Sequence, residues 1–177
     1  MSYITKNELL TYPSILKSYA LSEARDNLKL EKANVEVVVF LAHSHEDEEL
    51  IENARLLIAS QGAKIYVDYK DPSMPPITSP ETAKLLKERI KACKKFIMLA
   101  SNNALESKWV PWELGFADSA RLINNVAIFP VVDRDSVWKG NEYVGIYQRI
   151  EKADSGAWAV FPAGTTSGTK LSDWLKS

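Results

Sequence analysis

The chain has almost no cysteine, since Cys93 is the only one among its 177 residues. A single thiol cannot form an intramolecular disulfide or supply a multi-cysteine metal site. The chain also lacks any apolar run near the length of about 20 residues that a membrane-spanning helix needs. Its first residues show no pattern of charged, apolar and small residues of the kind that marks a secretory signal. We therefore expect a cytoplasmic protein without a disulfide framework.

The sequence is equally poor in net charge. Its 22 basic and 23 acidic residues leave a formal net charge of -1 at pH 7. This balance gives no electrostatic footprint for nucleic acid or for an anionic membrane, so we predict neither as a partner. A GxGxxG motif is also missing after every predicted strand, which argues against a dinucleotide site of the Rossmann type.

The chain does have the composition of a globular domain, with 46% apolar and 25% charged residues. At this length it is most simply one domain with one substantial core. The first 34 residues differ from the rest because they are amphipathic and helix-like, with an interruption near Pro13. We interpret residues 1–34 as an N-terminal helical extension, packed on the domain or used to dimerise, and residues 35–177 as the domain itself.

Strand-like and helix-like segments alternate along the domain. Continuous apolar or β-branched runs predict strands buried on both faces, and apolar residues at helical spacing predict helices. The predicted strands are residues 35–42, 63–69, 96–101, 126–133 and, more weakly, 157–162. Helices are predicted within 43–62, over 80–95 and 109–122, and at the C-terminus, whereas 134–156 is predicted to be irregular. This alternation favours a flavodoxin-like α/β fold of three layers with a central five-stranded parallel sheet.

A flavodoxin-like strand order also predicts where a ligand binds. The crevice of such a sheet lies at the carboxyl ends of the first and third strands, where the winding of the chain reverses. The loop after the first predicted strand contains His43 and Ser44, and the loop after the third runs directly into Trp109 and Glu113. These two loops are therefore the candidates for the functional site.

Glu113 lies in the stretch SKWVPWELGFADSA, residues 107–120. On a helix it would share a face with three apolar residues, Trp109, Phe116 and Ala120. The carboxylate could simply complement the positive end of the helix dipole, an effect worth about 0.3–1 kcal/mol. Alternatively, it could bind ribose hydroxyls or stabilise an oxocarbenium-like transition state as a glycosidic bond breaks. The residues by themselves leave both interpretations open.

Other polar and aromatic residues near the two loops are also candidates. Trp109 follows the third strand, where its ring could stack on a planar base. His43 and His45 are the only histidines, and because no third ligand is evident we predict no metal site. They either shape the crevice or have a structural role. Asp68, at the end of the second strand, is either a turn former or a polar wall of the crevice.

Four segments, in their order along the chain, resemble the TIR (Toll/interleukin-1 receptor) domain of the stand-alone prokaryotic type. They are a strand ending in FLAHSHED, an IYVD strand, a proline-bearing loop and the block SKWVPWELG. The resemblance covers roughly residues 35–133. The chain departs from the serine–aromatic pair that usually ends the first strand, because it has Ala42, His43 and Ser44 there.

This resemblance implies a flavodoxin-like fold and an enzymatic activity. Many prokaryotic, plant and axonal TIR domains cleave NAD+ at the nicotinamide–ribose bond, giving nicotinamide and ADP-ribose or a cyclic isomer. Bacterial members commonly serve anti-phage defence signalling. The resemblance thus implies an NAD+ glycohydrolase or cyclase that uses NAD+ as substrate, with no cofactor and no metal. The family's catalytic glutamate, four residues after a tryptophan, matches Glu113 after Trp109.

The resemblance also implies roles for residues around this pair. The residues expected to line the substrate pocket beside Trp109 are Phe40, His43, Ser44 and Asp68. The family's gating and assembly loop matches residues 70–80, with Asp71, Pro72, Pro75 and Pro76. That match implies a homo-oligomer, and the product implies a downstream effector that senses the nucleotide. Two alternatives remain: a non-catalytic TIR scaffold acting by homotypic assembly, and a nucleoside deoxyribosyltransferase-like enzyme.

Overall fold

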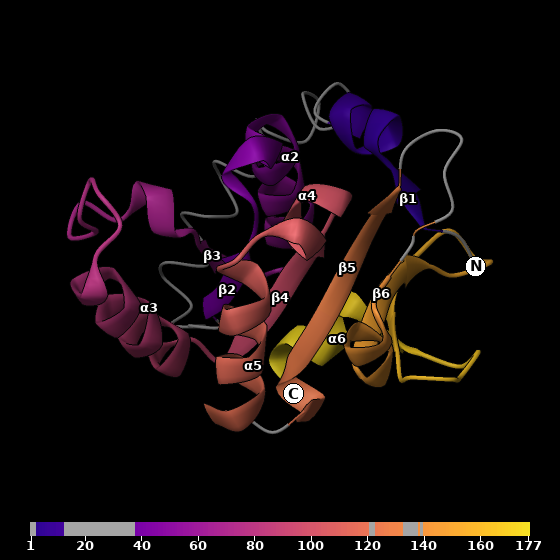
Figure 1. Cartoon of the computed structure of the whole chain (residues 1–177). Helices are drawn as coiled ribbons and strands as arrows, with labels where there is room; N and C mark the ends of the chain where they lie inside the picture. The colour runs from indigo at the N-terminus through magenta and orange to yellow at the C-terminus, as the bar shows by residue number, and fades with distance from the viewer. Residues whose placement is uncertain (1–2, 13–37, 121–122, 133–137, 139) are drawn as a thin grey trace.

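A curled, mostly parallel sheet runs through the middle of the chain (Figure 1). The structure is a computed structural model that describes residues 3–12, 38–120, 123–132, 138 and 140–177. Neighbouring strands follow the order β3-β2-β4-β5-β6-β7-β8, and β1 pairs with β5. Their bounds are β1 (Ile4–Thr5), β2 (Val38–Ala42), β3 (Lys64–Tyr66), β4 (Lys95–Ala100), β5 (Val126–Val132), β6 (Gln148–Lys152), β7 (Trp158–Phe161) and β8 (Thr169–Lys170).

The strand order confirms the flavodoxin-like prediction. The first predicted strand, β2, pairs in parallel with β3 on one side and with β4 on the other. The chain therefore moves outward in one direction to β3 and then crosses back to β4 and β5, so the winding reverses between β2 and β4. Residues 35–37, the start of the predicted first strand, lie outside the described residues.

The fifth parallel strand is not the one predicted from the sequence. Residues 148–152, expected to be irregular, form β6 and pair in parallel with β5. Residues 158–161 do form a strand, β7, but it runs antiparallel to β6, and β8 runs antiparallel to β7. The parallel part of the sheet thus has the expected five strands, in the order β3-β2-β4-β5-β6. The antiparallel strands β7 and β8 extend the sheet at one edge.

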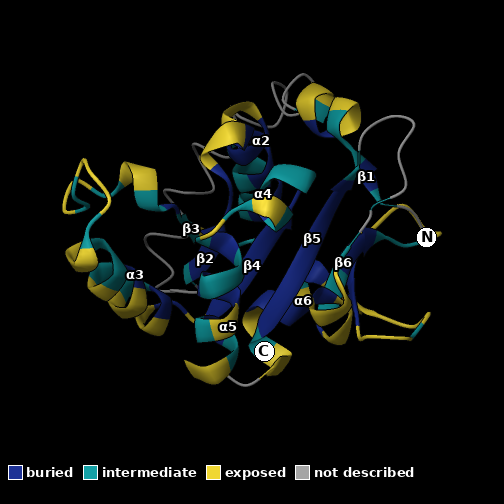
Figure 2. Ribbon diagram, in the orientation of Figure 1, coloured by how far each residue is buried: buried dark blue, intermediate teal, exposed yellow. Residues whose placement is uncertain are grey.

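Helices cover both faces of the sheet, and each face has its own apolar cluster. One cluster joins α2 and α6 to alternate strand residues such as Leu41, Leu99 and Phe129. The other joins α3 and α5 to the intervening residues such as Phe40, Met98 and Ile128. Figure 2 shows the buried strands between the half-exposed helices. The helices are α2 (Glu48–Ala59), α3 (Pro80–Ala92), α4 (Asn102–Glu106), α5 (Val110–Ala120) and α6 (Leu171–Lys176).

Local sequence explains where several of these elements begin. Helix α3 starts with a capping box between Ser79 and Thr82 and with Pro80 at its first position, where a missing amide proton is tolerated. Strand β3 ends earlier than predicted because the chain turns into a short 3-10 helix, Asp68–Lys70. In the described ranges, no helix is long and apolar enough to cross a membrane.

The first described residues pack on the sheet. Ile4 and Thr5 extend the sheet by pairing with Val131 and Val132 at the end of β5. Residues 6–12 are helical, and the Thr5 and Glu8 side chains each accept a hydrogen bond from the other residue's amide, which caps this helix. Leu9 is fully buried in the α2–α6 cluster. The predicted boundary at residue 34 lies outside the described residues.

Candidate active site

A cavity of about 400 Å³ opens at the carboxyl ends of β2 and β4, where the strand order predicts a ligand crevice. Its walls come from the segments that follow β2, β3 and β4. The lining residues are His43, Ser44, His45, Glu46, Asp68, Thr78, Thr82, Leu86, Asn103, Glu106, Ser107, Trp109 and Glu113. The structure thus brings together five of the predicted site residues from three separate stretches of the chain: Glu113, Trp109, His43, Ser44 and Asp68.

Glu113 is a buried carboxyl group at the cavity wall. It lies in the first turn of α5, and only 5% of the residue is exposed. Burial, and then the charge of nearby Asp68, raises the pKa of Glu113 well above its ordinary value. A glutamate that served only the helix dipole would be stabilised in its charged form, which would lower its pKa. The raised pKa is the opposite behaviour, and it is typical of carboxyl groups placed for chemistry.

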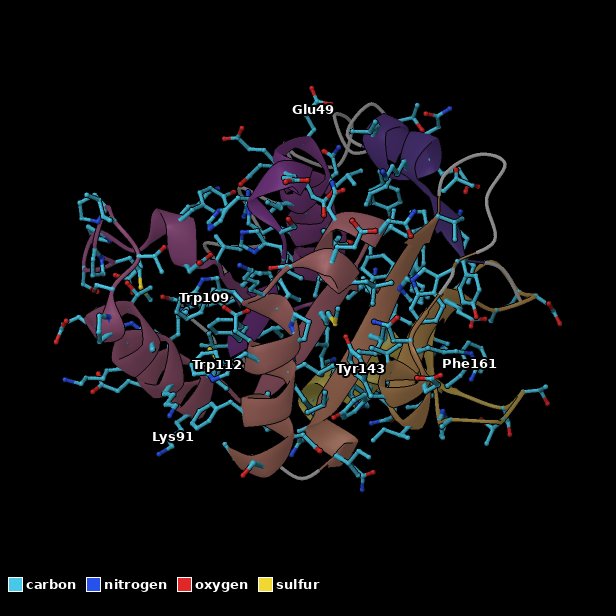
Figure 3. The ribbon with its side chains drawn as sticks, viewed as in Figure 1. Glu49, Lys91, Trp109, Trp112, Tyr143 and Phe161 are labelled. Atoms are coloured by element: carbon cyan, nitrogen blue, oxygen red, sulfur yellow. The ribbon has the colours of Figure 1, made fainter. Side chains whose placement is uncertain are left out.

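Trp109 precedes α5 and shares the cavity with Glu113. Its ring meets the ring of Trp112 edge-on, with centroids 5.5 Å apart and planes at 85° (Figure 3). Trp112 in turn stacks on Phe116, so the aromatic row of α5 runs from Trp112 to Phe116. The stretch is helical through Ala120, as the predicted shared face of Trp109, Glu113, Phe116 and Ala120 requires, but burial decreases along it, because Phe116 is half-buried and Ala120 is exposed.

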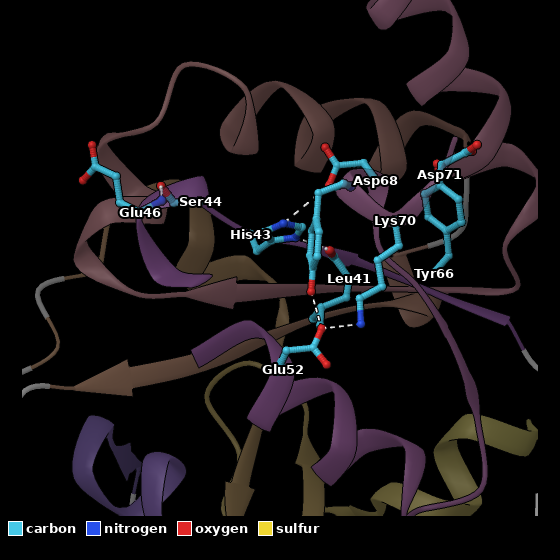
Figure 4. Close-up of polar contacts among 10 residues, drawn as sticks. Leu41, His43, Ser44, Glu46, Glu52, Tyr66, Asp68, Lys70 and Asp71 are labelled. Carbon is cyan, nitrogen blue, oxygen red and sulfur yellow. Dashed lines mark hydrogen bonds and ion pairs between the residues drawn. The ribbon is translucent and has the colours of Figure 1, made fainter. Parts of the chain in front are cut away.

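His43 directly follows β2 and is 7% exposed. Its Nδ1 lies 2.9 Å from the carbonyl oxygen of Leu41, and its Nε2 lies 3.4 Å from Asp68 Oδ1 (Figure 4). Burial lowers the pKa of His43 more than the Leu41 carbonyl and the Asp68 charge raise it. The imidazole is therefore held neutral at neutral pH, with one nitrogen bound to the backbone.

Ser44 and Asp47 shape the loop after β2. The Ser44 side chain caps the short helix His45–Asp47 by accepting a hydrogen bond from the Glu46 amide. The Asp47 side chain does not cap this helix. It accepts hydrogen bonds from Ser101 and from Asn103, which lines the cavity. Sequence reasoning missed this link because its partners lie 54 and 56 residues away.

Phe40, predicted to line the pocket, lies in the core instead. It is 2% exposed, stacks on Phe96 with ring centroids 5.5 Å apart, and tilts against Tyr66. It belongs to the apolar cluster between the sheet and α3 and α5, and it is not among the residues that line the cavity. Phe40 lies two residues before the end of β2, inside the sheet, where it packs against the rings of Phe96 and Tyr66 and does not reach the cavity at the carboxyl end.

The loop over residues 70–80 is fixed at its base and exposed further along. Asp71 accepts hydrogen bonds from Tyr66 and Ser73 and pairs with Arg89 of α3 at 2.7 Å. These contacts, those of Ser73 above all, hold the pKa of Asp71 far below its usual range. Beyond Asp71, Pro72 and Pro76 are exposed, Pro75 is half-buried, and Ile77 is 80% exposed. Thr78 brings the same loop to the cavity.

The lining of the cavity is acidic. Its carboxyl groups belong to Glu46, Asp68, Glu106 and Glu113, and no lysine or arginine among the described residues lines it. Within the residues that the structure describes, no group of three or more metal-ligating side chains could hold a metal ion. The arrangement favours a ligand that brings a positive charge and hydroxyl donors to the buried carboxyl group.

The sequence profile of the TIR domain family matches residues 39–158, a span that contains the whole cavity lining. The chain belongs to the TIR domain family. This membership confirms the resemblance and agrees with the flavodoxin-like strand order. The matched span runs from the second residue of β2 through β6 and includes the catalytic candidates of this TIR domain.

Two bacterial proteins are similar to this TIR domain. "Probable 3' cyclic ADP-D-ribose synthase ThsB'" from Bacillus cereus (strain MSX-D12) is 37% identical over 166 residues, covering 86% of this chain and 84% of that protein. "Putative cyclic ADP-D-ribose synthase TIR2" from Cytobacillus dafuensis is 30% identical over 82 residues, covering 45% of this chain and 22% of that protein. Both names describe the synthesis of a cyclic ADP-ribose.

Proposed function

We propose that this TIR domain cleaves the nicotinamide–ribose bond of NAD+ and releases nicotinamide with ADP-ribose or a cyclic ADP-ribose isomer. The observation that carries this proposal is Glu113, a buried carboxyl group that lines an acidic cavity at the switch point of the sheet. The names of the two relatives support the same substrate class, since a cyclic ADP-ribose is made from NAD+ by removal of nicotinamide.

The electrostatics of the cavity suit the nicotinamide riboside half of NAD+. That half has a positively charged pyridinium ring, whereas the diphosphate is negative and would be repelled by the acidic side chains that line the cavity. In the empty site, burial favours the protonated form of Glu113. A bound cation favours the ionised form, so substrate binding and loss of the Glu113 proton support each other.

The proposed chemistry needs one well-placed negative charge. As the bond between ribose C1 and the ring nitrogen breaks, its electron pair goes to the pyridinium ring, which leaves as neutral nicotinamide. Positive charge develops on the ribosyl group, and the Glu113 carboxylate stabilises that charge. Water then attacks C1 and loses a proton to give ADP-ribose, or a nucleophile of the same molecule attacks to give a cyclic product. Neither route requires a metal ion or a cofactor.

Trp109 contributes a flat apolar surface beside the reacting group. Its ring is half-buried and braced edge-on by Trp112. An aromatic ring attracts a neighbouring cation and stacks on planar rings, and both interactions fit a pyridinium. The proposal therefore assigns Trp109 to the nicotinamide end of the substrate, next to the bond that Glu113 helps to break.

The test is incubation of the purified protein with NAD+, followed by mass spectrometry of the products. Glu113→Gln keeps the size of the side chain but removes its charge, and we expect the rate of NAD+ cleavage to fall at least ~100-fold. Glu81→Gln is the matched control, because Glu81 also lies in the first turn of a helix but is outside the cavity. A folded Glu113→Gln protein with a near wild-type rate contradicts the catalytic assignment.

The same assay separates the alternative functions. A scaffold that acts only by TIR–TIR assembly leaves NAD+ intact at every protein concentration. A deoxyribosyltransferase-like enzyme instead exchanges the base of a deoxynucleoside, so parallel incubation with a deoxynucleoside and a free base detects it. Product analysis further distinguishes ADP-ribose from a cyclic isomer, whose mass is lower by one water.

We also propose that the active form is a homo-oligomer assembled through the loop at residues 70–80. This loop exposes Ile77 and carries Thr78 at the cavity mouth. An exposed apolar residue next to the site gives a neighbouring protomer a surface to bind. Specific activity should therefore rise with protein concentration, and a flat dependence for a confirmed monomer contradicts this part of the proposal. The proposed setting is cytoplasmic anti-phage signalling, with a downstream effector that senses the product.

A further inference from the structure

One buried nitrogen at the cavity wall has no hydrogen-bond partner. This atom is Nε2 of His43, and it is unpartnered among the described residues although the side chain is only 2% exposed. Asp68 Oδ1 lies 3.4 Å away, but the contact does not have the geometry of a hydrogen bond. Buried polar atoms without a partner are rare and costly, and they often mark a place that a ligand completes.

The backbone decides which nitrogen of His43 is protonated. The carbonyl oxygen of Leu41 can only accept a hydrogen bond, so Nδ1, 2.9 Å away, carries the proton and donates it. The neutral ring then has a bare lone pair on Nε2. The nearest oxygen belongs to the Asp68 carboxylate, which also only accepts. Two hydrogen-bond acceptors therefore face each other at the cavity wall with no proton between them.

Neighbouring side chains hold the imidazole in this orientation. His45 and Tyr69 contact the ring edge-on, with centroid distances of 5.9 Å and 5.5 Å. Tyr69 is itself fixed, because its hydroxyl donates to Glu52. Glu52 also pairs with Lys70 (Figure 4). The ring cannot turn its lone pair toward another donor without losing the Leu41 bond. The acceptor pair is thus preorganised in the empty cavity.

We propose that His43 Nε2 and the Asp68 carboxylate together bind the two hydroxyl groups of a ribose cis-diol, each acceptor taking one hydroxyl proton. The two oxygens of a cis-diol lie roughly one hydrogen-bond length apart, which matches two acceptors at 3.4 Å. Acidic side chains commonly bind ribose hydroxyls in nucleotide sites. The inference rests on the proposed function, in which the diol is that of the nicotinamide-side ribose.

Substrate analogues test this assignment. The probes are NAD+, its two analogues with a 2'-deoxy or 3'-deoxy ribose on the nicotinamide side, and its 3-acetylpyridine analogue, which lacks the carboxamide amino group. His43→Asn retains an amide donor for Leu41 but removes Nε2. We expect this change to lower kcat/KM for NAD+ and for the acetylpyridine analogue by ~10–100-fold. For the deoxy analogue that lacks the hydroxyl bound by His43, the loss should be less than about threefold.

Because each comparison uses the same substrate in two proteins, the intrinsic reactivity of a deoxyriboside cancels. An equal loss of kcat/KM for all four substrates overturns the proposal, because such a result would show that His43 has only a general structural role. A loss that disappears only for the acetylpyridine analogue also overturns it, since the donor is then the carboxamide. Glu81→Gln, at a residue outside the cavity, is the control, and it should leave the discrimination between NAD+ and the deoxy analogues unchanged.

A second variant changes the other acceptor of the pair, Asp68. Asp68→Asn supplies an amide donor that can satisfy His43 Nε2 in the empty protein. We expect a higher Tm together with weaker ribose binding, whereas a merely structural Asp68 would give a lower Tm. A variant that is less stable and keeps the wild-type KM contradicts the proposal.

Imidazole ¹⁵N NMR of the wild-type protein needs no variant, because the chain has only two histidines. Nε2 of His43 should appear as an unprotonated nitrogen, and ADP-ribose should shift it as its lone pair accepts a hydrogen bond. Absence of this shift at saturating ADP-ribose overturns the inference. If the wild type cleaves no NAD+, the proposed function fails, and the same titration still decides whether His43 accepts a ribose hydroxyl.

Discussion

Asp47, immediately before α2, accepts a 2.9 Å hydrogen bond from Asn103 of α4, although 56 residues separate the two. Its other oxygen accepts a hydrogen bond from Ser101, and the Ser101 hydroxyl accepts one from the Ala104 amide at the start of α4. Asp47 and Ser101 are both buried. One carboxylate thereby joins the segments after β2 and β4, which both line the cavity.

This relationship predicts that Asp47→Ala weakens both the fold and the active site. The change leaves the buried Ser101 hydroxyl and the Asn103 amide without their acceptor, at a cost of about 1–3 kcal/mol for each unsatisfied group. It also frees α4, whose residues line the cavity, so NAD+ cleavage should fall even where the protein remains folded. Urea unfolding and steady-state kinetics measure the two effects.

Asp173→Ala is the control for the Asp47 prediction, because Asp173 is an exposed aspartate in α6 outside the cavity. A double-mutant cycle with Ser101→Ala should give a coupling energy of about 1 kcal/mol or more between Asp47 and Ser101. Additive effects of the two single substitutions would show that the link does not join the loops energetically.

Glu113 predicts a dependence of stability on pH. Its pKa is raised in the folded state, so the folded protein retains the Glu113 proton above pH 4.5, where the unfolded chain loses it. The folded state therefore loses stability as the pH rises from about 4.5 through the folded pKa. Each unit between the folded and unfolded pKa corresponds to about 1.4 kcal/mol. Glu113→Gln removes this penalty, and we expect its Tm to exceed that of the wild type by several degrees at pH 8.

The sign of the Glu113 effect is checked by repeating the melts near pH 4.5, where the difference between the two proteins should shrink. Asp68→Asn removes the like charge that adds to burial, so in that variant the advantage of Glu113→Gln should be smaller. A wild type that is more stable than Glu113→Gln at pH 8 would support the helix-dipole interpretation instead. Loss of activity together with a gain of stability is the signature of a residue kept for function.

The base of the loop at residues 70–80 gives a third prediction. Arg89 donates to Asp71 and to Ser73, which holds the loop against α3. Arg89→Met removes both bonds, so amide exchange at Ser73 and Met74 should accelerate by ~10-fold. Arg55→Met is the matched control, because Arg55 pairs with Glu52 of its own helix. Equal exchange in both variants would mean that the Asp71–Arg89 pair does not order the loop.

Continuous apolar runs made the centre of the sheet predictable from the sequence. All six residues of β4 are buried, and their pattern indicates a strand without knowledge of its neighbours. Strand β6, with the sequence QRIEK, has no such run, and its buried Glu151 pairs with Arg149. The direction of β7 depends on the turn that joins it to β6, which periodicity does not encode. Periodicity therefore identified the doubly buried strands and missed those stabilised by polar pairs.

The residues of the candidate site also fall into those that the sequence predicts and those that it does not. Glu113 and Trp109 are predictable because they lie on one short stretch at a position that the topology selects. Phe40 was misplaced because it lies within the strand, and a single sequence does not show that Phe96 and Tyr66 pack against it. The partners of Asp47 and the acceptor pair of His43 and Asp68 join distant segments, and a single sequence carries no signal for such contacts. Local rules thus identify the element that carries the site, and packing decides which side chains complete it.

The N-terminal segment gives the last prediction. Residues 4–12 add a short strand beside β5 and a capped helix, although the sequence alone allowed them to be a separate extension. Leu9 is fully buried in the same cluster as Phe129 and Trp174, whereas the next residue, Leu10, is 38% exposed. Two adjacent leucines of one helix therefore differ almost only in their burial, which makes each a control for the other.

We expect Leu9→Ala to lower the free energy of unfolding by about 2–5 kcal/mol, because it removes buried methyl groups and leaves a cavity in the core. Leu10→Ala should cost about 0.5 kcal/mol or less, as an exposed substitution does. Urea unfolding of the full chain measures both values. If the two variants lose similar small amounts, the segment does not belong to the cooperative core and residues 4–12 are a removable extension. If Leu9→Ala is the more costly change, deletion of residues 1–12 must destabilise the domain, because the deletion removes Ile4 and Leu9 together.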